Sequence, residues 1–251
     1  MGRMLPADFS LLDLTALVWL FLAWAVHGLA VDKGLFGAAS LNAHMQGVRR
    51  AWMRNMLDRE NRMMDSMLLG HLITSVSFFA STTVLVLAGL IGVMAAAEDA
   101  HRVVMDLGFT RPGSRALFEM KLLAIALIFV FAFFAFTWSI RQFNYTVALL
   151  GAFPLRGPAK DGQPLGPPSP EMELLVTETA GVLSRAVRAF NSGLRCYYFA
   201  FATLGWFVGP EMFMALVAGV MLLLLARQFR SGSYAAVKRY AAALGAKDQP
   251  L

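Results

Sequence analysis

A run of seventeen uncharged residues at positions 122–138 most constrains how this chain can fold. Five phenylalanines lie in this run, and Lys121 precedes it. A helix rises about 1.5 Å per residue, so a helix over residues 119–142 is long enough to cross a hydrocarbon layer about 30 Å thick. The whole chain is 58% hydrophobic and 15% charged, whereas soluble domains have about 25% charged residues. The sequence therefore predicts an integral membrane protein.

Four further apolar segments predict additional membrane spans, at residues 11–31, 68–97, 189–208 and 211–227. We expect an all-α bundle of about five transmembrane helices that forms one membrane domain over residues 1–251. Three amphipathic parts, at residues 42–67, 143–188 and 228–247, are expected to extend into the cytoplasm. Within the second part, we expect the helix to break at Phe153-Pro154, a loop to follow from residue 155, and a new helix to start at Ser169-Pro170. Because no helix breaker lies between Arg59 and Leu68, the first of these is expected to run directly into the second span.

The distribution of basic residues predicts the orientation of the chain. With five spans, one side holds only Arg3, Arg102, Arg111, Arg115 and Lys121, and the other side holds the remaining 17 of the 22 Lys and Arg residues. If residues 196–226 formed a single kinked span, the division would be nearly even. The positive-inside rule therefore favours five spans, with the N-terminus outside and the C-terminus in the cytoplasm. We expect the protein to lie in a bacterial inner membrane.

Small residues recur along the second span and form a small-residue seam, which consists of Gly70, Thr74, Ser77, Ser81, Ala88 and Gly92. Small side chains let two helix backbones approach closely in lipid. The seam is expected to pack within the chain; a subunit interface or a pore-lining face are the alternatives.

Polar and charged residues gather near the cytoplasmic ends of three predicted helices. They are Arg54 and Asp58; Arg141, Gln142, Asn144 and Tyr145; and Arg188, Asn191 and Arg195. Ionisable residues at membrane depth are costly and often functional. One hypothesis is a basic vestibule that gathers small anions. The other is a structural network of Arg–Asp pairs that locks the helical extensions together.

Motifs for catalysis and metal binding are not evident in the sequence. It contains no P-loop, no Gly-x-Ser-x-Gly and no His-Glu-x-x-His motif, and its single Cys196 cannot form an internal disulfide. We therefore expect neither an enzyme nor a cofactor nor a metal site. A weak alternative is a haem held by His27 and His71, which the five-span topology places at similar depths.

Several sequence strings resemble the membrane-protein family catalogued as domain of unknown function 599. The matching strings are residues 49–53, 56–59, 77–82, 133–145 and 195–198, together with Asp65 and Lys121. The string from Trp138 to Tyr145, WSIRQFNY, is the most specific of these. The resemblance covers most of the chain and implies a multi-span membrane fold, with no known activity.

The leading functional expectation is a homo-oligomeric channel or transporter-like protein for a small solute, with anions among the candidates. The alternative is a non-catalytic accessory or scaffold subunit of a larger membrane complex. The expected partners are membrane lipid, further copies of this chain and such a complex. Nucleic acid is not expected, because the basic residues flank apolar spans, where membrane topology already explains them.

Overall fold

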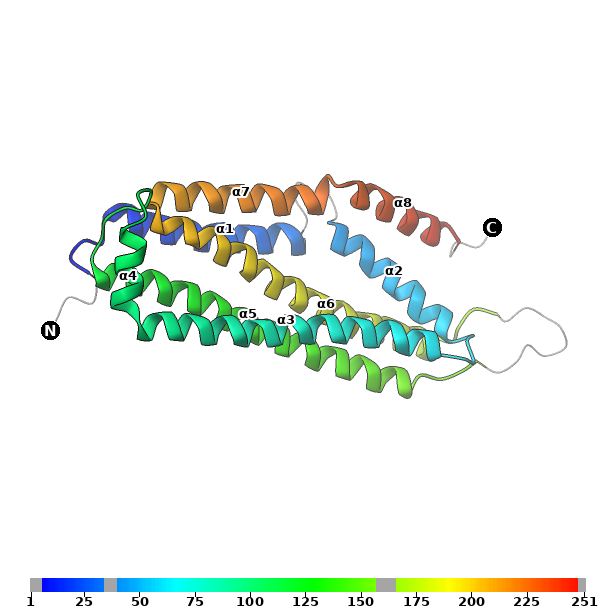
Figure 1. Cartoon of the computed structure of the whole chain (residues 1–251). Coiled ribbons are helices and arrows are strands. Elements are labelled where there is room, and N and C mark those ends of the chain that lie inside the picture. Colours follow the sequence, from blue (N-terminus) through cyan, green and yellow to red (C-terminus); the bar gives the residue numbers. More distant parts are fainter. Residues whose placement is uncertain (1–5, 34–39, 157–165, 248–251) are drawn as a thin grey trace.

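The computed structural model describes residues 6–33, 40–156 and 166–247, and within these ranges the chain forms helices and no strands (Figure 1). The elements are α1 (Leu11–Lys33), α2 (Leu41–Met56), α3 (Met63–Ala95), α4 (Ala97–Met105), α5 (Arg115–Gly151), α6 (Pro170–Thr203), the 3₁₀ helix η2 (Leu204–Phe207), α7 (Pro210–Phe229) and α8 (Gly232–Lys247).

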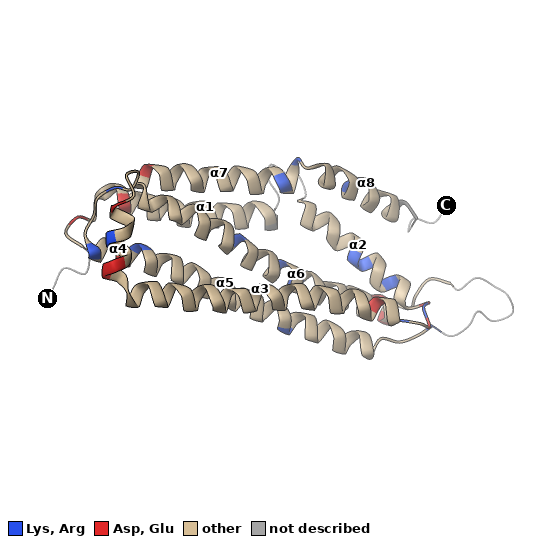
Figure 2. Cartoon of the chain, viewed as in Figure 1, with Lys and Arg blue, Asp and Glu red and all other residues tan. Residues whose placement is uncertain are grey.

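The helices form an elongated bundle with two distinct ends (Figure 1). α1, α3, α5, α6 and α7 run along its length. The short α4 lies at one end, beside the starts of α1 and α7, and we call this the α4 end. α2 and α8 lie toward the other end, which we call the α2 end, and there α3, α5 and α6 extend past the ends of α1 and α7. Figure 2 shows that most charged residues lie near the two ends.

Four helical segments are long and apolar enough to cross a membrane, as expected of an integral membrane protein. They are Leu11–Val31, Met63–Ala95, Arg115–Gly151 and Pro210–Gly245. The predicted span at 189–208 is not among them. It belongs to α6, whose apolar character is interrupted by Arg188, Asn191 and Arg195.

The core lies where α5 packs on α6, the helix pair with the most extensive contact in the bundle. Phe136 of α5 is fully buried, and a Cβ atom at Gly193 of α6 would overlap its ring. Ser139 donates a hydrogen bond to the carbonyl oxygen of Ala186 at 2.8 Å. Absence of a side chain at Gly193 therefore sets how closely the two helices approach.

Two connections differ from the prediction. The helix expected over residues 42–67 is broken, because α2 ends at Met56 and α3 begins at Met63. Tertiary contacts hold this break: the backbone N–H of Arg156 donates to the carbonyl oxygen of Leu57 at 2.9 Å, and Arg62 donates to the carbonyl oxygens of Phe153 and Pro154. The second connection, between the second and third predicted spans, contains the amphipathic helix α4, which was not among the expected helices.

The extension over residues 143–188 is interrupted near the predicted positions. α5 ends at Gly151, and α6 begins at Pro170 with Ser169 as its N-cap, whose side chain accepts from the N–H of Met172. Part of the intervening segment, residues 157–165, lies outside the described residues. The last predicted extension, 228–247, corresponds to the end of α7 and to α8.

Candidate functional site: a basic pocket between α1, α6 and α7

The residues predicted to form a vestibule divide into three groups in the structure. Arg54 belongs to the first group, because its guanidinium binds both carboxylate oxygens of Glu173, at 2.7 and 3.2 Å. Asp58 also belongs to it and accepts two hydrogen bonds from Arg156, at 2.5 and 2.6 Å. The Arg54–Glu173 pair joins α2 to α6, and the Asp58–Arg156 pair joins the segment after α2 to the segment after α5. The structure thus places these two residues in ion pairs between separate segments of the chain.

A buried carboxylate extends the same network. Asp65 is 1% exposed, and its Oδ1 accepts hydrogen bonds from the Arg59 guanidinium at 2.5 Å and from the Trp52 indole at 2.6 Å. We call the ion pairs Arg54–Glu173, Asp58–Arg156 and Arg59–Asp65 the α2-end lock. The arginines of this lock therefore already have carboxylate partners.

The second group lies on α5 and points away from the other residues. Arg141, Asn144 and Tyr145 are exposed, and Arg141 donates a hydrogen bond to the hydroxyl of Tyr145 at 3.1 Å. Gln142 is buried on the opposite side of the same helix. The structure therefore does not bring these residues to a common site with Arg188 and Arg195.

The third group, Arg188, Asn191 and Arg195 on α6, lines a pocket of about 340 Å³, which we call the basic pocket. The ends of α1 and α7 and the start of α2 complete its walls. Its lining residues are His27, Gly28, Val31, Asn42, Arg188, Asn191, Ser192, Arg195, Leu224, Arg227 and Gln228. This volume lies in the range of small-molecule sites.

The charge of the basic pocket is one-sided. Arg188, Arg195 and Arg227 line it, and among the described residues of its wall there is no Asp or Glu. Arg227 donates to the hydroxyl of Tyr198 at 2.9 Å and has no carboxylate within 4.0 Å in the part of the chain that the structure describes. Guanidinium groups bind carboxylate and phosphate through fixed, paired N–H donors. The described wall of the pocket therefore carries positive charge.

A fourth arginine lies behind the pocket wall and adds to this field. Arg49 of α2 is 8% exposed and donates to the hydroxyl of Ser184 at 3.3 Å. Burial, with the positive charge of Arg188, lowers the pKa of Arg49 to about 10. Within the described parts of the chain, neither Arg49 nor Arg188 has a carboxylate within 4.0 Å. An anion bound near Arg188 would relieve this repulsion.

A histidine closes the inner wall of the pocket. His27 is 6% exposed, and its Nδ1 lies 2.8 Å from Nη1 of Arg195. A guanidinium can only donate, so Nδ1 accepts, and the proton of a neutral His27 ring is on Nε2. That buried Nε2 has no hydrogen-bond partner among the described residues. The pocket wall thus contains a further donor in need of an acceptor.

The two histidines of the haem alternative do not form a pair. His27 contacts Arg195, whereas His71 is exposed on α3. One imidazole is thus already engaged on the α6 side of the bundle, and the other points away from the core. The physical reason is that similar depth along two helices does not make their side chains face each other.

The small-residue seam also differs from its first interpretation. α3 packs on α5 through Leu69, Val76 and Ala80, whereas Gly70, Thr74, Ser81, Ala88 and Gly92 are exposed and Ser77 is half-buried. A Cβ atom at Gly70 or Gly92 would have no neighbour within 4 Å. The seam therefore does not pack within the chain, and its role as a subunit interface stays a prediction.

Sequence reasoning missed the part of the pocket that comes from α2 and α7. Asn42, Arg227 and Gln228 were not expected near Arg195, and His27 was considered only for haem. A usable signal was present, because Arg227 and His27 both lie near predicted cytoplasmic ends of spans. What the sequence could not provide is the neighbour relation of α1, α6 and α7.

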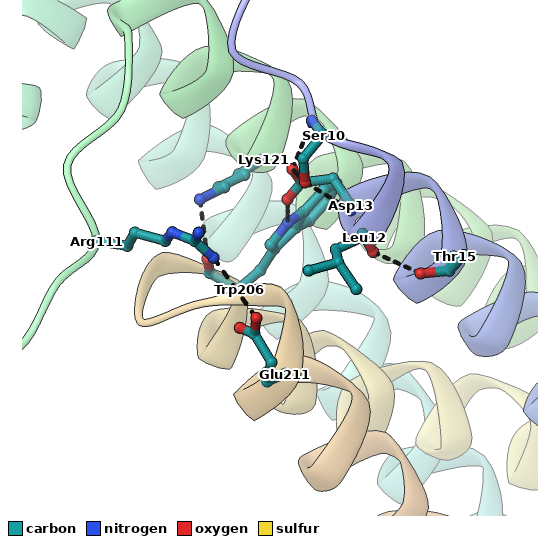
Figure 3. A network of polar contacts seen from close by, with 8 residues as sticks. All are labelled: Ser10, Leu12, Asp13, Thr15, Arg111, Lys121, Trp206 and Glu211. Atoms are coloured by element: carbon teal, nitrogen blue, oxygen red, sulfur yellow. Dashed lines mark hydrogen bonds and ion pairs between the residues drawn. The ribbon is translucent and has the colours of Figure 1, made fainter.

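The α4 end carries a different kind of polar cluster (Figure 3). Lys121 donates to the carbonyl oxygen of Trp206 at 2.8 Å, and the indole of Trp206 donates to Asp13 at 2.6 Å. Ser10 donates to the second oxygen of Asp13 at 2.5 Å. Asp13 and Lys121 are both buried. A cavity of about 80 Å³ beside them is lined by Asp8, Asp13, Arg111 and Lys121 among others, so its charges are balanced.

Comparison with known proteins gives one match. A family model described as "Protein of unknown function, DUF599" matches residues 15–233. No curated protein and no solved structure matches the chain.

Proposed function

We propose that this chain, which belongs to the DUF599 family, is a transporter-like membrane protein that binds a small anionic solute in the basic pocket. The observation that carries the proposal is the convergence of Arg188, Arg195 and Arg227 on one pocket whose described wall has no carboxylate. Neither Arg188 nor Arg227 has a carboxylate within 4.0 Å among the described residues, and their two positive charges favour an anion in the space between them.

The proposed topology has five membrane crossings: the four long apolar segments and, in addition, α6, which lies between α5 and α7 in the chain. α5 ends at the α2 end and α7 begins at the α4 end, so α6 leads the chain back along the bundle (Figure 1). Its 34 residues reach about 50 Å at 1.5 Å per residue. The α2 end carries most of the basic residues, and we place it in the cytoplasm of a bacterial cell, with α2, α8 and the ends of α3, α5 and α6 beyond the membrane.

This topology puts the basic pocket at the cytoplasmic boundary of the membrane, where α1 and α7 end. One helical turn farther toward the α4 end, Trp24 of α1 stacks on Phe199 of α6 with ring centroids 5.6 Å apart. These two stacked rings lie between the basic pocket and the α4 end. Rings that close the route there favour a gated, transporter-like mechanism over an open channel.

Anion flux into proteoliposomes tests the proposal. We expect Arg188→Gln and Arg227→Gln each to reduce uptake of radiolabelled phosphate, sulfate or succinate about tenfold, since a charge-assisted hydrogen bond contributes about 1.5–3 kcal/mol. Arg230→Gln and Arg141→Gln are matched controls, because each removes an arginine from the same end of the bundle without touching the pocket. Wild-type uptake in both pocket variants, or no uptake of any of these anions by the wild-type protein, would exclude this function.

A second candidate function is a non-catalytic subunit of a larger membrane assembly. It is favoured by the outward face of α3, where the seam lies beside exposed Met63, Met64, Met67 and Phe78. Native mass spectrometry of the gently solubilised protein separates the two candidates. A ring of identical chains is expected for a homo-oligomeric transporter, and one copy bound to other polypeptides is expected for an accessory subunit.

A further inference from the structure

Packing accounts for one side of the WSIRQFNY string on α5 but not for the other side. Ser139 and Phe143 are buried, whereas Trp138, Arg141 and Tyr145 are exposed. The three exposed residues recur at intervals of three and four positions, so they form one stripe along the helix, which we call the α5 outer stripe. None of them belongs to the described wall of the basic pocket. The role of this stripe is therefore separate from the proposed anion transport.

The α5 outer stripe lies at the end of an apolar helix face. The exposed residues of α5 from Leu123 to Phe134 are all apolar. On this side of the helix the flanking charged residues are Glu119 and Arg141, which are about 33 Å apart at 1.5 Å per residue. Lys121 lies between them in the sequence but is buried. Since a hydrocarbon layer is about 30 Å thick, Arg141 lies at its boundary with the headgroups.

The contact between α5 and α6 gives the same depth. Ser139 donates to the carbonyl oxygen of Ala186, and Arg188, two residues farther along α6, lines the basic pocket beside the ends of α1 and α7. The α5 outer stripe therefore lies at about the depth at which these two spans end. Tryptophan and tyrosine favour this boundary, because an apolar ring and a polar N–H or O–H are combined in one side chain.

The polar groups of the stripe present donors to this boundary. Nε of Arg141 donates to the hydroxyl of Tyr145 at 3.1 Å, which orients the guanidinium and leaves its two Nη groups for an outside acceptor. Within the described parts of the chain, Arg141 has no carboxylate within 4.0 Å, and the indole N–H of Trp138 has no acceptor. Paired guanidinium N–H groups match two oxygens of one phosphate.

We propose that the α5 outer stripe binds the headgroup of an anionic phospholipid, with phosphate oxygens on Arg141 and acyl chains along Trp138 and Phe134. Lipid is favoured over a dissolved anion, because the acyl chains hold the phosphate of a lipid at the depth of Arg141. An anionic lipid is favoured over phosphatidylcholine, because the choline group carries a positive charge that opposes the guanidinium.

Quenching of tryptophan fluorescence by brominated lipids tests this site in vesicles that contain the full-length protein. Each protein is compared with the same protein carrying Trp138→Phe, so that the difference reports on Trp138 alone. We expect brominated phosphatidylglycerol to bind next to Trp138 about fivefold more tightly than brominated phosphatidylcholine, since one basic residue near an anionic lipid surface contributes about that factor. Arg141→Gln should bring this ratio to about one.

Arg230→Gln is the matched control, because it removes an arginine near the end of α7 and should keep the ratio at Trp138. Equal quenching by the two lipids in the wild-type protein, or a preference that survives Arg141→Gln, would overturn the lipid site. Quenching by neither lipid would overturn it too and assign this face of α5 to contact with another polypeptide. In vesicles of phosphatidylcholine alone the stripe has no anionic headgroup to bind, so anion uptake measured there tests the basic pocket separately.

Discussion

Arginine has two different roles in this protein, and the partner of each side chain decides which one it has. Arg54, Arg59 and Arg156 each bind a carboxylate of the α2-end lock. Arg188 and Arg227 instead line the basic pocket. The sequence could predict that basic residues gather at this end, but not this division. Glu173 lies 119 residues from Arg54, and such a distant pairing depends on how α2 packs on α6.

Asp65 is the residue at which the lock is most sensitive. We expect Asp65→Ala to lower the free energy of unfolding by about 2 kcal/mol. The substitution removes the buried acceptor of the Arg59 guanidinium and of the Trp52 indole. Because Arg59 is partly exposed, the loss is smaller than for a fully buried ion pair. Thermal unfolding in detergent measures this change as a lower Tm.

The matched control for that variant is Asp106→Ala, because Asp106 is an exposed acidic residue near the α4 end. Its Tm should stay close to that of the wild-type protein. If both substitutions lowered Tm equally, the contacts of Asp65 would not explain its effect.

α6 is the element on which both the core and the pocket depend. One side of this helix packs on α5 through Gly193, and another presents Arg188, Asn191 and Arg195 to the pocket. The sequence predicted the start of this helix at Ser169-Pro170 correctly, because a capping serine followed by proline is a local signal. The helix break between α2 and α3 was not predictable in that way, since residues 57–62 contain neither Gly nor Pro and the break depends on contacts with Arg62 and Arg156.

The close approach of α5 and α6 at Gly193 can be tested by substitution. We expect Gly193→Ala to lower the free energy of unfolding by about 2 kcal/mol, because the added methyl group would overlap the buried ring of Phe136. Tm in detergent is again the readout.

Gly181→Ala on the same helix is the control. Its Cβ would have its nearest neighbour, Nη1 of Arg185, at an ordinary 3.6 Å, and alanine favours a helix over glycine by about 1 kcal/mol. This variant should keep or raise Tm. A Gly193→Ala protein as stable as the wild type would show that α5 and α6 are not in such close contact.

For the whole molecule, the sequence predicted an all-helical membrane protein because long apolar runs carry that information directly. The proposed crossing by α6 is harder to recognise from hydropathy, since Arg188, Asn191 and Arg195 interrupt the apolar character of this helix and line the basic pocket.

Cysteine labelling tests the proposed five crossings in intact cells. In a Cys196→Ala background, a cysteine at position 106 should react with a membrane-impermeant maleimide added outside. A cysteine at position 238 should react only after the membrane is permeabilised, because five crossings put α4 and α8 on opposite sides. Both positions are exposed on the protein. Labelling of both from outside would contradict the proposed topology.

The uneven distribution of charge between the two ends has an energetic consequence for any anion that uses the basic pocket. Bacterial cells maintain a membrane potential that is negative inside, and moving one elementary charge through 100 mV changes its free energy by about 2.3 kcal/mol. In the proposed orientation the pocket faces the cytoplasm, and release of an anion to the outside runs downhill in this potential, so it needs no other source of energy unless the concentration outside is much higher. Uptake in the opposite direction runs uphill, so it requires a co-transported cation or a steep concentration gradient.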